Sequence, residues 1–151
     1  MDIIHSVTVK ATPERVLETI TTQEGLAGWW TPDSTAEPRV GSVNEHRFGA
    51  FGALRMRVDV LEPARVVWSA VSGCPEEWKT ARITFTIRPD ENGASLEFRQ
   101  GEISDDYESV GEFNYLWGQY MRSLRIYAET GVGEPYGSEE SKKARTTPRR
   151  G

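Results

Sequence analysis

Few side chains in this sequence have the types and spacing that catalysis or metal binding requires. The imidazoles and the thiol are limited to His5, His46 and Cys74, which are widely separated and lack metal-ligand spacing. We therefore expect no metal and no other cofactor. His46, in "VNEHRFG", could act as an acid or base if it points inward. No carboxylate accompanies it at a diagnostic spacing, so we favour a strand histidine that faces solvent or is hydrogen-bonded near a sheet edge.

The other polar candidates are equally isolated. Cys74 precedes Pro75 in a loop and has no identifiable histidine partner, so we interpret it as a plain thiol. Tyr120 could present its hydroxyl to the interior, which makes Tyr120 and His46 the only, weak, catalytic candidates. The glycines around Phe51 in "RFGAFGAL" fit a strand bend or a hairpin tip near a cavity mouth.

A ring-rich segment between Gly111 and Gly131, "GEFNYLWGQYMRSLRIYAETG", is the strongest periodic signal. Its large apolar side chains fall three or four residues apart and so share one helix face; they are Phe113, Trp117, Tyr120, Met121, Leu124 and Tyr127. Most of these side chains are aromatic rings or a thioether, whereas the apolar face of an ordinary amphipathic helix consists mainly of Leu, Ile and Val. Such a face can cover either a filled core or a ligand cavity.

The elements before this helix predict what it covers. "IIHSVTVK" alternates as a strand, "TPERVLETITT" begins with a capping threonine and a proline, and "GLAGWW" is a short helix that ends before Pro32. Five segments with a period of two follow through short connections; they are "SVNEHRFG", "ALRMRVDVLE", "VVWSAV", "ARITFTIR" and "ASLEFRQG". Asp105 and Asp106 then begin the long helix, and Gly131 ends it.

This order predicts an α+β fold in which a curved antiparallel sheet is covered by the long C-terminal helix. Two local arrangements stay open. Trp29 and Trp30 are adjacent, so we expect one to pack under the sheet and the other to lie nearer a cavity rim. "VVWSAV" is apolar on both faces, so either Val67 or Trp68 could pair beside Val60.

Composition sets the class of protein. The chain has 151 residues, 37% hydrophobic and 27% charged, with a net charge of −5. This favours a folded domain that does not bind nucleic acid. No apolar run reaches membrane-spanning length and no signal peptide is evident, so we expect a soluble cytoplasmic protein. We predict one domain over residues 1–136 and a flexible polar tail over residues 137–151.

Several stretches carry a family likeness: "WW" after the second helix, "LEPARVVWSAV", "PEEW…ITFTI" and, most specifically, "SLRIYAETGVGEPYG". They resemble the activator of Hsp90 ATPase homologue-like (AHSA-type) branch of the SRPBCC, or START/Bet v 1-like, superfamily. The likeness covers roughly residues 1–136 in element order. It implies a helix-grip fold with a hydrophobic cavity between sheet and helix, in a superfamily that binds lipids, polyketides and flavonoid-like molecules.

Our first hypothesis is therefore a binding module for a small apolar or aromatic molecule. The expected cavity residues are Trp30, Phe48, Met56, Val58, Trp68, Ile83, Phe85, Phe98, Phe113, Trp117, Tyr120 and Met121. If Trp117 lines such a cavity, Trp117→Ala should cost clearly less than the about 3–5 kcal/mol of a truncated core ring.

Two alternatives remain. A cyclase or hydrolase would use His46 and Tyr120 on a similar ligand. A protein-binding role related to the chaperone name ranks last, because the expected outer sheet faces are polar, so we expect no chaperone partner. A homodimer stays an open alternative.

Overall fold

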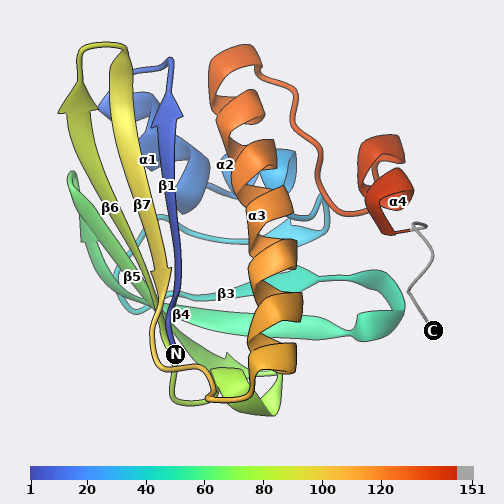
Figure 1. Ribbon diagram of the computed structural model, residues 1–151. Helices are drawn as coiled ribbons and strands as arrows, with labels where there is room; N and C mark the ends of the chain where they lie inside the picture. Colours follow the sequence, from blue (N-terminus) through green and yellow to red (C-terminus); the bar gives the residue numbers. More distant parts are fainter. Residues whose placement is uncertain (146–151) are drawn as a thin grey trace.

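The computed structural model describes residues 1–145, in which a curved sheet wraps around one long helix (Figure 1). The strands are β1 (Ile3–Val9), β2 (Ser34–Thr35), β3 (Val43–Arg47), β4 (Ala53–Glu62), β5 (Arg65–Ser72), β6 (Arg82–Asp90) and β7 (Gly93–Gln100). The α-helices are α1 (Pro13–Thr21), α2 (Gln23–Trp29), α3 (Tyr107–Thr130) and α4 (Glu139–Arg145). The predicted helix-grip arrangement is confirmed: α3 lies across the sheet, and α1 and α2 follow the first strand.

Every strand pair is antiparallel, in the order β1-β7-β6-β5-β4-β3-β2. Strands β3 to β7 follow the chain as the predicted meander, and β1 forms the other edge of the sheet by pairing with β7. Ile3 lies opposite Gln100 and Val9 opposite Ala94. The two-residue strand β2, which the sequence does not predict, forms the edge next to β3.

Local capping explains where the helices begin and end. The Thr12 side chain accepts a hydrogen bond from the Arg15 backbone N–H at the start of α1. Asp106 does the same for Ser109 at the start of α3, at 3.3 Å. Gly131 ends α3 with a φ of 85°, a left-handed conformation that glycine adopts without a steric penalty.

The register of β4 and β5 decides which residue of "VVWSAV" pairs beside Val60. A register shift between Val58 and Val60 places Val60 opposite Val67 and Val58 opposite Trp68. Trp68 is buried inside the sheet, where its ring lies 5.6 Å from that of Trp30. Val67, rather than Trp68, is therefore the neighbour of Val60.

Both adjacent tryptophans are buried in the core, and Trp30 also lines the pocket described below, as expected for the one nearer a cavity. Trp29 is 0% exposed and Trp30 is 1% exposed, and their rings stack 5.6 Å apart. Helix α2 contacts α1, α3 and β2, so side chains on more than one of its faces are covered. The Trp29 indole N–H also donates to the Thr19 carbonyl at 2.6 Å.

The segment predicted as a flexible polar tail, residues 137–151, contains one short helix in its described part. Helix α4 occupies Glu139–Arg145, and the Ser138 hydroxyl accepts a hydrogen bond from the Ser141 N–H at its start. The rest of the predicted tail, residues 146–151, lies outside the described residues. None of the helices described is long and apolar enough to cross a bilayer.

Candidate ligand pocket

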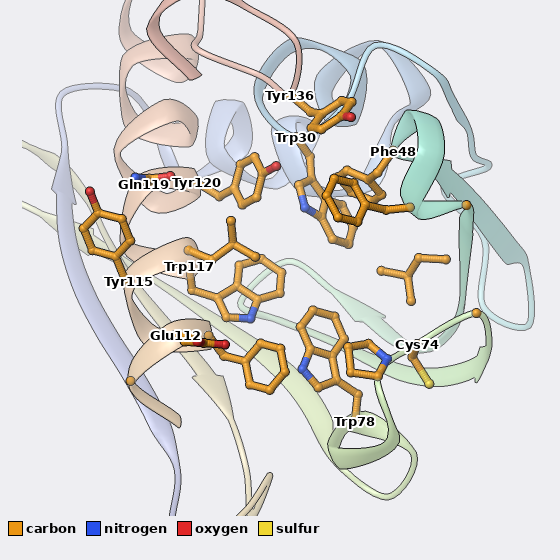
Figure 2. A pocket seen from close by; sticks show the side chains of 18 of the residues that line it. Trp30, Phe48, Cys74, Trp78, Glu112, Tyr115, Trp117, Gln119, Tyr120 and Tyr136 are labelled. Atoms are coloured by element: carbon orange, nitrogen blue, oxygen red, sulfur yellow. The ribbon is translucent and has the colours of Figure 1, made fainter. Parts of the chain in front are cut away.

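A pocket of about 1220 Å³ lies between the first half of α3, the β3–β4 hairpin and the β5–β6 loop (Figure 2). Half of its twenty lining residues are aromatic; these are Trp30, Phe48, Phe51, Trp78, Tyr107, Phe113, Tyr115, Trp117, Tyr120 and Tyr136. Concave sites with mostly apolar walls and a few polar groups are typical ligand sites.

Helix α3 supplies one wall because of its residue spacing. Phe113, Trp117 and Tyr120 follow each other at intervals of four and three residues, so they point to the same side. Gly111 lies one turn before Tyr115 on this wall, and a Cβ at Gly111 would meet nothing within 4 Å. Gly111 is therefore an exposed position on this wall.

The hairpin forms the opposite rim. Gly49 and Gly52 have φ values of 56° and 87°, which allow the short turn between β3 and β4. Between them Phe51 is 80% exposed at the pocket rim. The sequence interpretation of this segment as a hairpin tip beside a cavity mouth agrees with this position.

The segment after α3 forms a third side through Tyr136. The Tyr136 backbone N–H donates to the Trp30 carbonyl at 2.8 Å, and its ring meets Phe48 edge-on at 5.5 Å. Ser123, fully buried in α3, holds the same segment: its hydroxyl donates to the Trp29 carbonyl and accepts from the Glu134 N–H, each at 2.8 Å.

Trp117 lies at the base of the pocket and is 1% exposed. Its indole N–H donates to Gln100 Oε1 at 2.9 Å. Its ring lies 4.5 Å from Phe98, 5.5 Å from Trp30 and 5.6 Å from Trp78. These rings fill the space between the middle of α3 and the sheet.

Five of the twelve predicted cavity residues line the pocket: Trp30, Phe48, Phe113, Trp117 and Tyr120. The other seven are not on its wall but belong to the buried core; they are Met56, Val58, Trp68, Ile83, Phe85, Phe98 and Met121. The physical reason is ring volume: Trp30 and Trp117 fill the region over the sheet, and the pocket lies beyond them at the hairpin end. That the five lining residues bind a ligand stays a prediction.

His46 is buried and hydrogen-bonded near the sheet edge, the second of the two positions favoured from sequence. Its Nδ1 lies 3.0 Å from the Ser34 hydroxyl on the edge strand β2, and the Trp30 ring lies 4.4 Å from its imidazole. Burial lowers the pKa of His46 to about 3, so its ring is neutral near pH 7. Tyr120 lines the pocket and His46 does not. The structure therefore does not bring the two catalytic candidates together in this pocket.

The charged lining residues are both acidic. Glu108 and Glu112 lie on the exposed side of α3, and no Lys, Arg or His is among the lining residues within the described part of the chain. Nor, within residues 1–145, does any group of three or more His, Cys, Asp or Glu side chains have the arrangement to hold a metal ion. The pocket thus combines an aromatic interior with a negative rim.

Sequence reasoning missed the contribution of the β5–β6 loop. Cys74 and Trp78 both line the pocket, Cys74 half-buried and Trp78 only 5% exposed. A single large ring in the otherwise polar stretch "SGCPEEWKT" was the available signal, because a loop tryptophan usually packs against something.

Residues 10–129 match the sequence profile of the family described as activator of Hsp90 ATPase homolog 1-like protein. This chain belongs to that AHSA1 family. The predicted branch of the superfamily is therefore confirmed. No curated protein matches the sequence.

Solved structures agree with this AHSA1 assignment. The Aha1 dimer from Colwellia psychrerythraea is similar, with a TM-score of 0.80 and 30% identity, over 88% of this chain and 99% of that chain. Protein SSP2350 from Staphylococcus saprophyticus has a TM-score of 0.75 and 20% identity, over 88% and 95%. DynU16, described as a putative protein in the dynemicin biosynthetic locus, has a TM-score of 0.73 and 22% identity, over 87% and 48%. The likeness to these last two proteins, at 20% and 22% identity, shows a shared fold alone.

Proposed function

We propose that this AHSA1 family member binds a small hydrophobic or aromatic ligand, of a lipid, polyketide or flavonoid-like kind, in the pocket beside α3. The observation that carries the proposal is the aromatic lining of a space of about 1220 Å³. Ligand pockets of drug-sized molecules occupy about 300–1,000 Å³, so the space is sufficient. The fold likeness to DynU16, from a biosynthetic locus, supports a ligand of this class.

The pocket walls favour binding energetically because they are held before any ligand arrives. Trp117 is anchored by Gln100 at its base, and Tyr136 is anchored through the Trp30 carbonyl. A wall that is already ordered loses little conformational entropy on binding. Each square ångström of apolar ligand surface removed from water then contributes about 25 cal/mol.

A fluorescence titration with Nile red, an uncharged dye that brightens in apolar sites, tests the proposal. Leu116→Trp enlarges a half-buried side chain that lines the pocket. Asn114→Trp is the matched control, because Asn114 is exposed on the same helix but is not a lining residue.

We expect wild type and Asn114→Trp to bind the dye alike, while Leu116→Trp binds at least about tenfold more weakly because its larger ring occupies part of the site. Absence of dye binding to the wild type, or equal binding to both variants, would contradict the proposal.

A further inference from the structure

The Trp78 indole nitrogen is a buried donor with no acceptor. Its Nε1–H has no hydrogen-bond partner within the described part of the chain, although the side chain is only 5% exposed. Two other core tryptophans differ: Trp29 donates to the Thr19 carbonyl and Trp117 to Gln100 Oε1. Because buried polar groups in folded proteins nearly always have partners, an orphan donor on a pocket wall calls for an explanation.

The surroundings of this donor are aromatic. The Trp78 ring stacks on Trp117 at 5.6 Å and meets Phe113 edge-on at 5.6 Å, and neither contact supplies an oxygen. In Figure 2 the nitrogen edge of Trp78 is turned toward α3. Because this nitrogen is buried, a ligand atom can reach it only if a neighbouring side chain moves, and Phe113, which meets the ring edge-on, is only half-buried.

The charge of the wall restricts what this ligand atom can be. Within the described residues the lining holds the carboxylates of Glu108 and Glu112 and no cation. An ionised carboxylate or phosphate that entered the aromatic interior would lose its hydration without gaining a counter-charge. A neutral acceptor loses much less and can accept the indole N–H.

We propose that the pocket selects an uncharged aromatic ligand whose carbonyl oxygen accepts the Nε1–H of Trp78. This inference rests on the proposed function. It adds the chemical class of the ligand and the residue that recognises the ligand carbonyl. Trp78 is then a specificity residue, and molecules with an ionised head group are poor ligands of this interior.

Three rigid probes of matched shape test the inference. Fluorenone carries a carbonyl, fluorene lacks it, and 9-oxofluorene-4-carboxylate adds a negative charge. Affinities are measured by calorimetry at low-micromolar concentration for the wild type and for Trp78→Phe, which retains a ring but removes the donor. Amide and indole N–H correlation spectra show which of the five tryptophan indoles responds and confirm that the variant is folded.

For the wild type we expect fluorenone to bind about three- to tenfold more tightly than fluorene, which is the usual range for one hydrogen bond. The carboxylate probe binds most weakly. The Trp78 indole proton, assigned by its absence in Trp78→Phe, moves downfield with fluorenone, whereas the Trp29 indole, already bonded to Thr19, does not. In Trp78→Phe the preference for fluorenone over fluorene disappears.

The possible results distinguish failure of the role of Trp78 from failure of the proposed ligand-binding function. If no probe binds, the ligand-binding function itself fails. If fluorenone and fluorene bind the wild type equally, or if Trp78→Phe keeps the fluorenone preference, binding stands and the role of Trp78 is wrong. Binding of the carboxylate probe as tight as that of fluorenone overturns the selection for uncharged ligands.

Discussion

The indole rings of Trp30 and Trp117 lie 5.5 Å apart and join the end of α2 to the middle of α3 inside the sheet. Trp68 and Phe98, both buried, extend this contact to the strands at 5.6 Å from Trp30 and 4.5 Å from Trp117. The space between the middle of α3 and the sheet is therefore filled by packed rings. The ligand pocket lies to one side of these rings, next to the β3–β4 hairpin.

Trp117→Ala should lower the free energy of unfolding by about 3–5 kcal/mol, the range for a truncated core ring. This reverses the sequence-based expectation of a smaller loss, because Trp117 contacts several rings and its removal leaves buried Gln100 Oε1 without its donor. Chemical denaturation measures the change. Tyr115→Ala, on the same helix but 64% exposed, is the control with an expected loss below about 0.5 kcal/mol. Similar losses for both variants would show that Trp117 is not part of a packed core.

His46 should make the protein less stable as the pH falls. Its folded-state pKa is lowered to about 3 by burial, against 6.5 for an ordinary histidine. Below pH 6.5 the unfolded chain therefore binds a proton here that the folded chain excludes, and stability falls by up to roughly 1.4 kcal/mol per pH unit until about pH 3. Above pH 6.5 this contribution is constant.

Urea denaturation between about pH 7 and pH 5 checks this for the wild type and for His46→Gln. The free energy of unfolding of the variant should fall less steeply as the pH falls, because its unfolding takes up about one proton fewer. Proton NMR of the His46 ring provides a second measurement, since its signals should not titrate across this range. Parallel stability profiles, or a ring that titrates near pH 6.5, would refute the prediction.

Gly25→Ala should destabilise the domain by about 1–3 kcal/mol, the usual cost of overpacking. An added Cβ would lie 2.6 Å from the Glu18 carbonyl oxygen and from the Thr19 Cα, backbone atoms that cannot move aside without separating α1 from α2. Gly111→Ala, where the Cβ meets nothing within 4 Å, should instead stabilise α3 by about 0.5–1 kcal/mol. Thermal unfolding compares the two variants, and the opposite order would show that the α1–α2 contact is not tight.

Ser123→Ala should loosen the wall that carries Tyr136. The substitution leaves the Trp29 carbonyl and the Glu134 N–H without their hydrogen-bond partner, at a cost of about 1–3 kcal/mol. Native-state hydrogen exchange should accelerate at the amides of Glu134 and Tyr136, and much less at the amide of Leu124 in the middle of α3. Unchanged exchange at Glu134 would mean that Ser123 does not hold this segment.

The sequence was sufficient for the elements because their signals are local. The alternation of Leu54 and Met56 with Arg55 and Arg57 predicts a strand with one buried face, and the structure has it. The Asp106 cap and the Gly131 terminator bound the long helix within a residue or two. Each signal depends on neighbours a few residues away, which a sequence displays directly.

The pocket could be predicted only in part. The spacing on α3 places Phe113, Trp117 and Tyr120 on one face, and all three line the pocket. Trp78 was not predicted there, because the position of a loop side chain depends on contacts with α3, more than thirty residues away in sequence. The neutral state of His46 likewise follows from burial beside Trp30, which no local pattern reports.

The amino-acid sequence alone thus determined the family, the order of strands and helices and the ring-rich face of α3. The tertiary structure decided whether those rings enclose a cavity or fill a core. Four rings pack together in the core: Trp30 at the end of α2, Trp68 in β5, Phe98 in β7 and Trp117 in α3. Close packing of these rings leaves no gap between them. The pocket lies where the hairpin and the β5–β6 loop diverge from α3, because the side chains of these separate segments together do not fill the space between them.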